Sequence, residues 1–165
     1  MEKAAASLSY AVRPVVLRYY LSRLSLMLGV LTAVPFAVAL LLGEQSLAGD
    51  LAITIGLLLS IWLPGRCDAA PRKLQVNEAL VVVALTFLLA PVFLLPAFVG
   101  QGLSITDALF ESISAFTTTG LSTVSQVHDF SPGLLLLRAW MQWCGGLGFA
   151  VFSVALVLGH QSGAR

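Results

Sequence analysis

The chain has 165 residues, of which 58% are hydrophobic and 10% are charged, whereas soluble domains carry roughly 25% charged residues. Because so small a fold cannot bury this much apolar surface, most of it must face lipid, which excludes soluble enzymes, disordered segments and secreted miniproteins. The formal net charge of +1 argues against a nucleic-acid binder, whose surface would be strongly basic. Cys67 and Cys144 follow neither a metal-binding nor a disulfide pattern, and we expect no cofactor or resident metal.

The start of the chain is amphipathic and basic. Residues 1–23 carry four basic residues and one acidic residue, so we predict that they form a cytoplasmic amphipathic stub lying on anionic lipid. A transit peptide is the alternative interpretation of this composition.

Four apolar runs follow, each long enough to cross a hydrocarbon core of about 30 Å. They are Leu24–Leu42, Leu47–Leu63, Ala79–Val99 and Gly133–Leu158. We expect Pro35 to kink the first run, and Pro91 and Pro96 to bend the third, which helices in lipid tolerate. The predicted parts after the stub are two leading helices with a cytoplasmic loop (24–78), the remaining helices with the segment between them (79–158) and a cytoplasmic tail (159–165).

The distribution of charge predicts an orientation. Eight of the nine basic residues lie in the stub, in the loop 64–78 or in the tail, and the ninth, Arg138, lies inside the fourth run. Segments 43–50 and 100–132 contain no lysine or arginine, so the positive-inside rule predicts that both termini are cytoplasmic. The opposite mouth is expected to be acidic and to attract cations through Glu44, Asp50, Asp107, Glu111 and Asp129.

The segment 100–132 is too long for a simple turn and contains a short apolar stretch. Ser104 is a candidate N-cap, and Asp107 falls in the first turn, where a carboxylate favours a helix. The helix that follows is predicted to have about 10–12 residues, too few to cross a membrane. It ends at Thr117–Gly120, where β-branched residues and a glycine favour extended backbone.

Backbone outside helix geometry is tolerated at membrane depth only where protein buries it or where it lines a watery cavity. A short re-entrant helix followed by a Thr-Gly stretch would point carbonyl oxygens, and the negative end of the helix dipole, into such a cavity. Rings of carbonyl oxygens replace the hydration shell of a monovalent cation. A re-entrant loop that only plugs the bundle is the alternative.

Two segments resemble the Trk/Ktr/HKT family of potassium transporters. The first, from Asp107 to Gly120, reads DALFESISAFTTTG, and the second, from Leu137 to Gly148, reads LRAWMQWCGGLG. In order and separation they are similar to the first pore repeat of the bacterial Trk membrane subunit. The resemblance implies translocation of potassium, with sodium as an alternative, across a bacterial cytoplasmic membrane. It also implies a cytosolic nucleotide-binding regulatory subunit as a partner.

In this family, four such repeats surround one ion path. The resemblance implies that Ala79–Val99 is the outer helix, that Gly133–Leu158 is the inner helix, and that one quarter of a selectivity filter consists of Thr117, Thr118, Thr119, Gly120 and Leu121. Leu121 stands where related sequences often carry a smaller residue. A single filter strand cannot encircle an ion, so we expect a homotetramer or a companion chain with further pore repeats. The alternative is a non-conducting membrane scaffold or a truncated single repeat.

Some residues are expected to support the filter. Arg138 is charged within the membrane, which favours a functional role, and we predict an ion pair with Glu111 or Asp129; snorkelling to the interface is the alternative. Three glycines are predicted to allow close helix packing, with a wide cavity or a hinge as the alternative: Gly145, Gly146 and Gly148. The sequence has no nucleophile constellation, zinc-protease motif or phosphate-binding loop, so we do not expect an enzyme.

Overall fold

The computed structural model describes residues 12–71, 74–124 and 130–162. Within these ranges all regular structure is helical, which confirms the predicted all-α class. The elements are α2 (Pro14–Leu41), α3 (Gln45–Gly65), α4 (Val76–Phe93), α5 (Leu95–Val99), α6 (Ile105–Phe116) and α7 (Pro132–Ser162). Four segments of the described chain are long and apolar enough to cross a membrane, as predicted: Pro14–Leu41, Gln45–Gly65, Val76–Val99 and Pro132–Val154.

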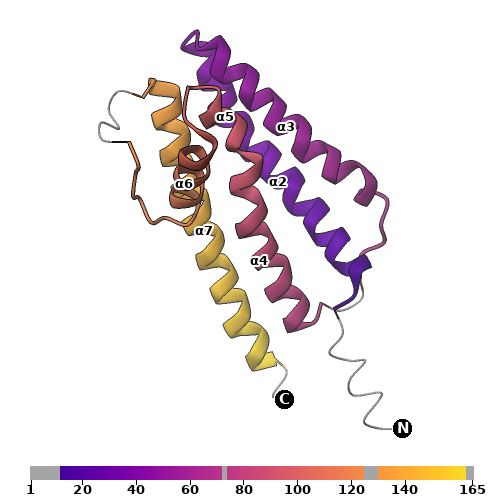
Figure 1. The fold of residues 1–165 in the computed structure, drawn as a ribbon. Coiled ribbons are helices and arrows are strands. Elements are labelled where there is room, and N and C mark those ends of the chain that lie inside the picture. The colour runs from indigo at the N-terminus through magenta and orange to yellow at the C-terminus, as the bar shows by residue number, and fades with distance from the viewer. Residues whose placement is uncertain (1–11, 72–73, 125–129, 163–165) are drawn as a thin grey trace.

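The long helices form a bundle in which α2 and α3 are a hairpin (Figure 1). The helices α2 and α4 begin, and α3 and α7 end, at one end of the bundle, which we call the basal end. The short helix α6 lies toward the opposite end, where it packs against α5, α4 and the first part of α7. The start and the end of the described chain are therefore on the same side.

The first helix starts earlier than the apolar run that predicts it. It begins at Pro14, because proline fits the first turn, where its missing N–H would be unpaired in any case. The described part of the predicted stub is thus mostly the beginning of α2, and residues 1–11 lie outside the described residues. With 28 residues, α2 is about 42 Å long, which exceeds a hydrocarbon core of about 30 Å.

Pro35 lies inside α2 without ending it. Because proline has no N–H, the carbonyl of Leu31 lacks the partner that a helix would normally supply. The indole Nε1 of Trp140, in α7, donates to this carbonyl at 2.9 Å. A neighbouring helix therefore satisfies the group that the proline frees, and the bond ties α7 to the middle of α2.

The third predicted run is interrupted where its prolines fall. Pro91 lies in the last part of α4 and Pro96 in the first turn of α5, with Leu94 as the junction between the two helices. Pro96 cannot donate to the carbonyl of the preceding turn, so the helix cannot continue in register there. The two pieces still form one candidate membrane span.

Two ion pairs join the helices at the basal end. Arg13 Nε lies 2.6 Å from Oε1 of the buried Glu78, so the start of α2 is tied to the start of α4. Arg18 Nη2 lies 2.6 Å from Oδ1 of Asp68, which follows α3. The hydrogen bond from Arg18 lowers the pKa of Asp68 below its ordinary value.

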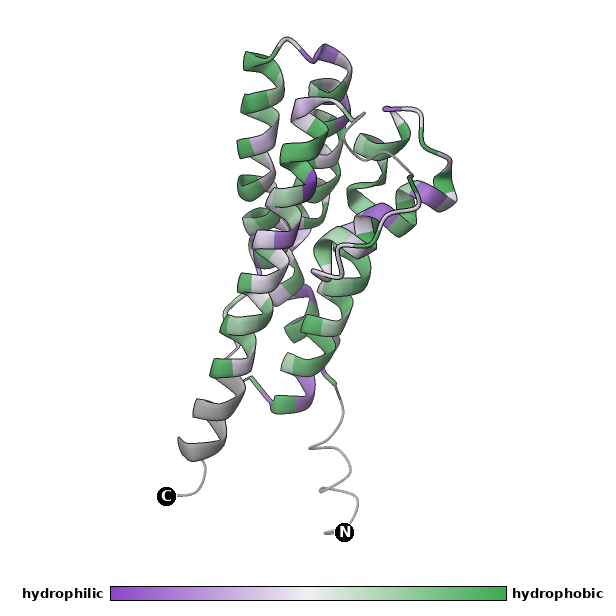
Figure 2. Ribbon diagram, turned by 90° about the vertical axis from the view of Figure 1, so that its left-hand side faces the viewer, coloured by the Kyte–Doolittle hydropathy of each residue, from purple (hydrophilic) through white to green (hydrophobic). Residues whose placement is uncertain are grey.

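The most deeply buried large apolar side chains lie at the end of the bundle that holds α6. They come from α3, α5 and α7 and include Leu47, Leu51, Phe98, Leu134 and Leu137. Along the rest of the long helices most residues are hydrophobic (Figure 2), and many of them are exposed at the surface. An apolar exterior is what lipid as a solvent favours, so we treat the chain as a membrane protein.

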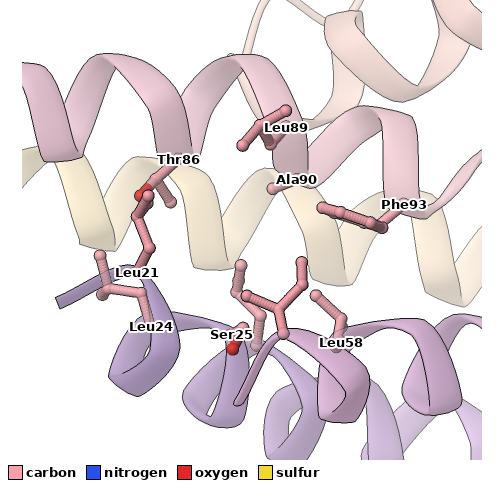
Figure 3. A pocket seen from close by; sticks show the side chains of 10 residues that line it. Leu21, Leu24, Ser25, Leu58, Thr86, Leu89, Ala90 and Phe93 are labelled. Carbon is pink, nitrogen blue, oxygen red and sulfur yellow. The ribbon is translucent and has the colours of Figure 1, made fainter. Parts of the chain in front are cut away.

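A small apolar cavity of about 60 Å³ lies between α2, α3 and α4 (Figure 3). Leu21, Leu58 and Leu89 are among its walls. Its two hydroxyl groups both donate within their own helices, Ser25 Oγ to Ser22 O and Thr86 Oγ1 to Val82 O, each at 2.8 Å. The cavity therefore belongs to the packing of the three helices and does not resemble an ion site.

Candidate functional site

The short helix begins as the sequence predicts. The Asp107 N–H donates to Ser104 Oγ at 3.2 Å, and Ser104 Oγ donates to Asp107 Oδ2 at 2.6 Å, so Ser104 is the N-cap. The helix has 12 residues and is about 18 Å long, which is too short for a hydrocarbon core of about 30 Å. Its last residue, Phe116, is buried.

One glycine sets how closely α6 approaches α7. A Cβ atom on Gly145 would lie 1.8 Å from the carbonyl oxygen of Phe116, so no other residue fits there without a shift of backbone. A Cβ atom on Gly146 would lie 3.2 Å from Thr118 Cγ2, and one on Gly148 would meet nothing within 4 Å. Close packing therefore explains Gly145, whereas Gly148 faces open space.

The backbone after α6 turns its N–H groups back onto the helix. The Thr118 N–H donates to Ala115 O at 3.1 Å, and the N–H groups of Thr119 and Gly120 donate to Ser114 O at 3.0 and 3.2 Å. In a trans peptide the carbonyl points opposite to the N–H of the next residue. The carbonyl oxygens of Thr117, Thr118 and Thr119 therefore point away from the end of α6.

Two residues of this stretch have left-handed backbone, Thr118 with φ 61° and Gly120 with φ 76°. Glycine adopts such a conformation at no steric cost, whereas it is unfavourable for a β-branched residue. The residue type therefore explains the left-handed backbone of Gly120 but not that of Thr118. The Thr118 hydroxyl donates to the carbonyl of Thr117 at 2.6 Å, and the N–H bonds to α6 hold the turn on both sides of it.

All five predicted filter residues are exposed on the surface of the chain. Among the described residues, no donor reaches the carbonyl oxygens of Thr118, Thr119 and Gly120. The Leu121 carbonyl differs, because it accepts from Ser114 Oγ at 2.6 Å and from Arg138 Nη2 at 2.9 Å. The stretch thus has free carbonyl oxygens in its middle and an anchored carbonyl at its end.

Arg138 and Glu111 form one of the two ion pairs that the sequence predicts. Arg138 Nε lies 2.7 Å from Glu111 Oε2, with 12% of the arginine side chain and none of the glutamate side chain exposed. The other glutamate oxygen accepts from Ser122 Oγ and, at 2.9 Å, from the Thr123 N–H. The alternative partner, Asp129, lies outside the described residues. The pair connects α6, α7 and the chain that follows the predicted filter.

A comparison with models of known protein families shows to which family the chain belongs. The family model described as TrkH, cation transport protein, matches residues 52–163, which include α6, the loop after it and α7. The chain belongs to the TrkH family.

Curated relatives agree with this assignment. A Trk system potassium uptake protein of Halomonas elongata, TrkI, is 35% identical over 142 residues, which are 83% of this chain and 28% of that protein. The TrkH protein of Escherichia coli K12 is 36% identical over 108 residues, 64% of this chain and 22% of that protein. An uncharacterised cation transporter of Methanocaldococcus jannaschii is 32% identical over 137 residues, 81% of this chain and 28% of that protein.

The TrkH-family chain therefore spans less than a third of the length of these relatives. No solved structure matches it significantly. Within the described residues, no group of three histidine, cysteine or acidic side chains could hold a metal ion.

Glu44 has a role that local sequence does not predict. Its Oε1 accepts from the Gly133 N–H at 2.9 Å, and its Oε2 accepts from Ser131 Oγ at 2.8 Å. A carboxylate at the start of α7 is favoured by the helix dipole. Of the acids expected at this end of the TrkH-family chain, Glu111 is paired with the basic Arg138, whereas Glu44 accepts hydrogen bonds from neutral groups.

Proposed function

We propose that this chain contributes to potassium translocation, with sodium as the alternative ion, through a pore in which Thr117–Leu121 is one quarter of the selectivity filter. The observation that carries the proposal is the direction of the backbone: three N–H groups bond to the end of α6, so the carbonyl oxygens point to the exposed side. Carbonyl oxygens so placed can replace the water around a monovalent cation. The helix α6 is then a re-entrant pore helix whose negative dipole end faces the ion.

The proposal requires other repeats. A cation that has lost its hydration shell needs oxygen ligands on all sides, and the exposed stretch supplies them from one side only. A homotetramer around a fourfold axis would close the ring, as would a companion chain with further pore repeats. The exposed face of the loop is where such neighbours would stand.

The supporting residues divide into two groups under this proposal. Gly145 lets the end of α6 approach α7 and Gly146 lies next to Thr118 of the filter stretch. The pair of Glu111 and Arg138 positions the far end of the stretch through the Leu121 carbonyl. Gly148, which faces open space, would leave room for a wide cavity below the filter. Neutralisation by Glu111 would also keep Arg138 from repelling cations in the path.

The names of the relatives and the charge pattern suggest the setting. The relatives are named as potassium uptake proteins, and the basic residues would place both termini in the cytoplasm of a bacterial cell, with the chain in its cytoplasmic membrane. A cytosolic nucleotide-binding regulatory subunit is the partner that the family implies.

The test measures ion flux together with the number of chains in the purified complex. Purified protein should form a closed oligomer, or co-purify with a companion chain, and carry potassium into liposomes in preference to sodium. Gly120→Ser should lower the ratio of potassium to sodium flux, because serine resists the backbone conformation at φ 76°. Gly102→Ser is the matched control, since Gly102 also has a positive φ of 92° and open space around it but lies before α6.

A non-conducting role is the second candidate. It is favoured by the exposure of Thr117–Leu121, because a single stretch with its carbonyl oxygens on an open surface does not enclose an ion by itself. A stable monomer that carries no ion, and that conducts only when other pore repeats are supplied, would establish a scaffold or single repeat instead. Equal selectivity in Gly120→Ser and the unaltered protein would contradict the filter assignment.

A further inference from the structure

The basal end of the bundle carries arginines of two kinds. Arg13 and Arg18 each have a carboxylate partner, Glu78 and Asp68. In the part of the chain that the structure describes, Arg23 and Arg66 have none. They are nevertheless held together, because Arg23 Nη2 donates to the backbone carbonyl of Arg66 at 3.2 Å.

The nearest acid cannot neutralise this pair. Asp68 lies close enough to Arg23 for the arginine charge to lower its pKa further, but Arg18 already binds both of its carboxylate oxygens, at 2.6 and 2.8 Å. Two arginines therefore share one aspartate and Arg66 adds a further positive charge, so a surplus of positive charge remains where the start of α2 and the end of α3 meet. A fixed surplus of this kind attracts a negatively charged ligand.

Aromatic rings hold both guanidinium groups in place. The Arg23 guanidinium lies 5.2 Å from the centre of the Tyr19 ring, and that of Arg66 lies 5.9 Å from the centre of the Trp62 ring. Both distances fall in the range of cation–π contacts. The Nε1 atom of Trp62 is buried, and the described residues provide no acceptor for it. An acceptor is therefore missing next to the same surplus of positive charge.

The depth of these arginines in the membrane indicates which negatively charged ligand they would meet. The uncharged run of α2 begins at Leu24, directly after Arg23, and from there to Leu41 the helix rises about 27 Å, close to the thickness of a hydrocarbon core of about 30 Å. Arg23, and Arg66 directly after the end of α3, therefore lie at the edge of the headgroup layer. Tryptophan, tyrosine and arginine are enriched at that level. The negatively charged group that is present there at high concentration is the phosphodiester of an anionic phospholipid.

We propose that Arg23, Arg66 and Trp62 form a binding site for the phosphodiester of an anionic phospholipid. The two guanidinium groups donate to the phosphate oxygens, and an oxygen of the headgroup accepts from the Trp62 indole N–H. The site joins the ends of the leading hairpin, on helices that do not carry the loop after α6, and it does not depend on the proposed ion path.

The experiment is native mass spectrometry of the full chain, in whatever oligomeric state it is purified, with added phosphatidylglycerol or phosphatidylcholine. Phosphatidylglycerol should bind more tightly than phosphatidylcholine. A basic residue at an anionic membrane surface strengthens binding about fivefold, so Arg23→Gln with Arg66→Gln should weaken phosphatidylglycerol binding about 25-fold and leave phosphatidylcholine unaffected. Excess inorganic phosphate should displace little of the lipid.

The charge-matched control is Arg72→Gln with Lys73→Gln, which removes an equal number of positive charges from positions between α3 and α4 in the sequence. An equal loss in the control would overturn the site in favour of diffuse attraction, as would equal binding of the two lipids. Complete displacement by inorganic phosphate would show a free anion site instead. Trp62→Phe keeps an aromatic ring beneath Arg66 and removes the N–H together with one ring of the indole. It should weaken binding by a smaller factor, also where the double arginine variant folds poorly, and no change would contradict the role of the indole N–H.

Discussion

The substitution Glu111→Gln tests whether the buried ion pair holds the predicted filter in place. Glutamine has nearly the same shape as glutamate and can still accept from Ser122 and from the Thr123 N–H. It removes the negative charge that faces Arg138 Nε at 2.7 Å. The arginine side chain is only 12% exposed, so its charge would be left largely buried and without a partner.

The size of the effect follows from this burial. Removal of one partner from a buried ion pair costs about 3–5 kcal/mol, because the remaining charge is desolvated and uncompensated. Arg138→Gln should cost a similar amount and should also release the Leu121 carbonyl. If the two residues act as one unit, the double variant should cost less than the sum of the single variants by about 2–3 kcal/mol.

The free energy of unfolding can be followed by helical circular dichroism as sodium dodecyl sulfate is titrated into detergent micelles. Asp107→Asn is the matched control, because it makes the same carboxylate-to-amide change on the same helix. The Asp107 carboxylate interacts with Ser104 and the helix dipole, so the expected loss in the free energy of unfolding is about 0.3–1 kcal/mol. Liposome flux, measured on equal amounts of folded protein, should fall in Glu111→Gln and Arg138→Gln and stay unchanged in Asp107→Asn.

Two results would refute the reasoning. Strictly additive losses in the double variant would show that the two side chains do not act as a pair. Unchanged flux in both single variants would show that the pair stabilises the chain without positioning the ion path.

Three further predictions concern packing and pH. Gly145→Ala should destabilise the protein by about 1–3 kcal/mol, because the new Cβ would lie 1.8 Å from the last carbonyl of α6. Gly148→Ala should not destabilise it, because a Cβ at that position meets nothing within 4 Å. Equal detergent-unfolding midpoints for the two variants would contradict this prediction. Trp140→Phe should cost about 1–3 kcal/mol, because a carbonyl of α2 loses its donor, and Pro35→Ala, which restores the helical N–H, should rescue most of that loss in thermal unfolding. The pKa of Asp68 is lowered by its arginine partner, so its contribution to stability is present above the ordinary aspartate pKa of about 3.9. That contribution should be lost as the pH falls through the lowered value, and Asp68→Asn should flatten the acid limb of a stability–pH curve.

The helices could be predicted because their signals are local. Length and apolar character place the four spans, and an N-cap serine with an acid three residues later places the start of α6. The break between α4 and α5 near Leu94 could be predicted for the same reason, because the prolines beside it are a local signal. The start of α2 was missed, because Pro14 and the basic residues after it suit both a separate amphipathic stub and the first turns of a longer helix.

The contacts that fix the candidate site are distant in sequence, which is why most of them could not be predicted. Glu44 and the start of α7 are 89 positions apart, and Trp140 and Leu31 are 109 positions apart. The pair of Arg138 and Glu111 was accessible because two charges in apolar helices each need a partner. No local pattern predicts the left-handed backbone of Thr118, since β-branched residues disfavour it.

That unfavourable conformation also bears on how the loop could work. A residue in a sparsely populated backbone region costs about 1–3 kcal/mol and persists only where its surroundings fix it. Here three N–H bonds to the end of α6 hold the stretch on one side, and Arg138 and Ser114 hold the Leu121 carbonyl on the other. Hydrogen bonds contribute about 0.5–1.5 kcal/mol each, so together they are sufficient to offset the strain at Thr118. The carbonyl oxygens are then oriented by the chain itself. Under the proposed function, an arriving ion would not need to order them, and neighbouring repeats would need only to set the width of the ring.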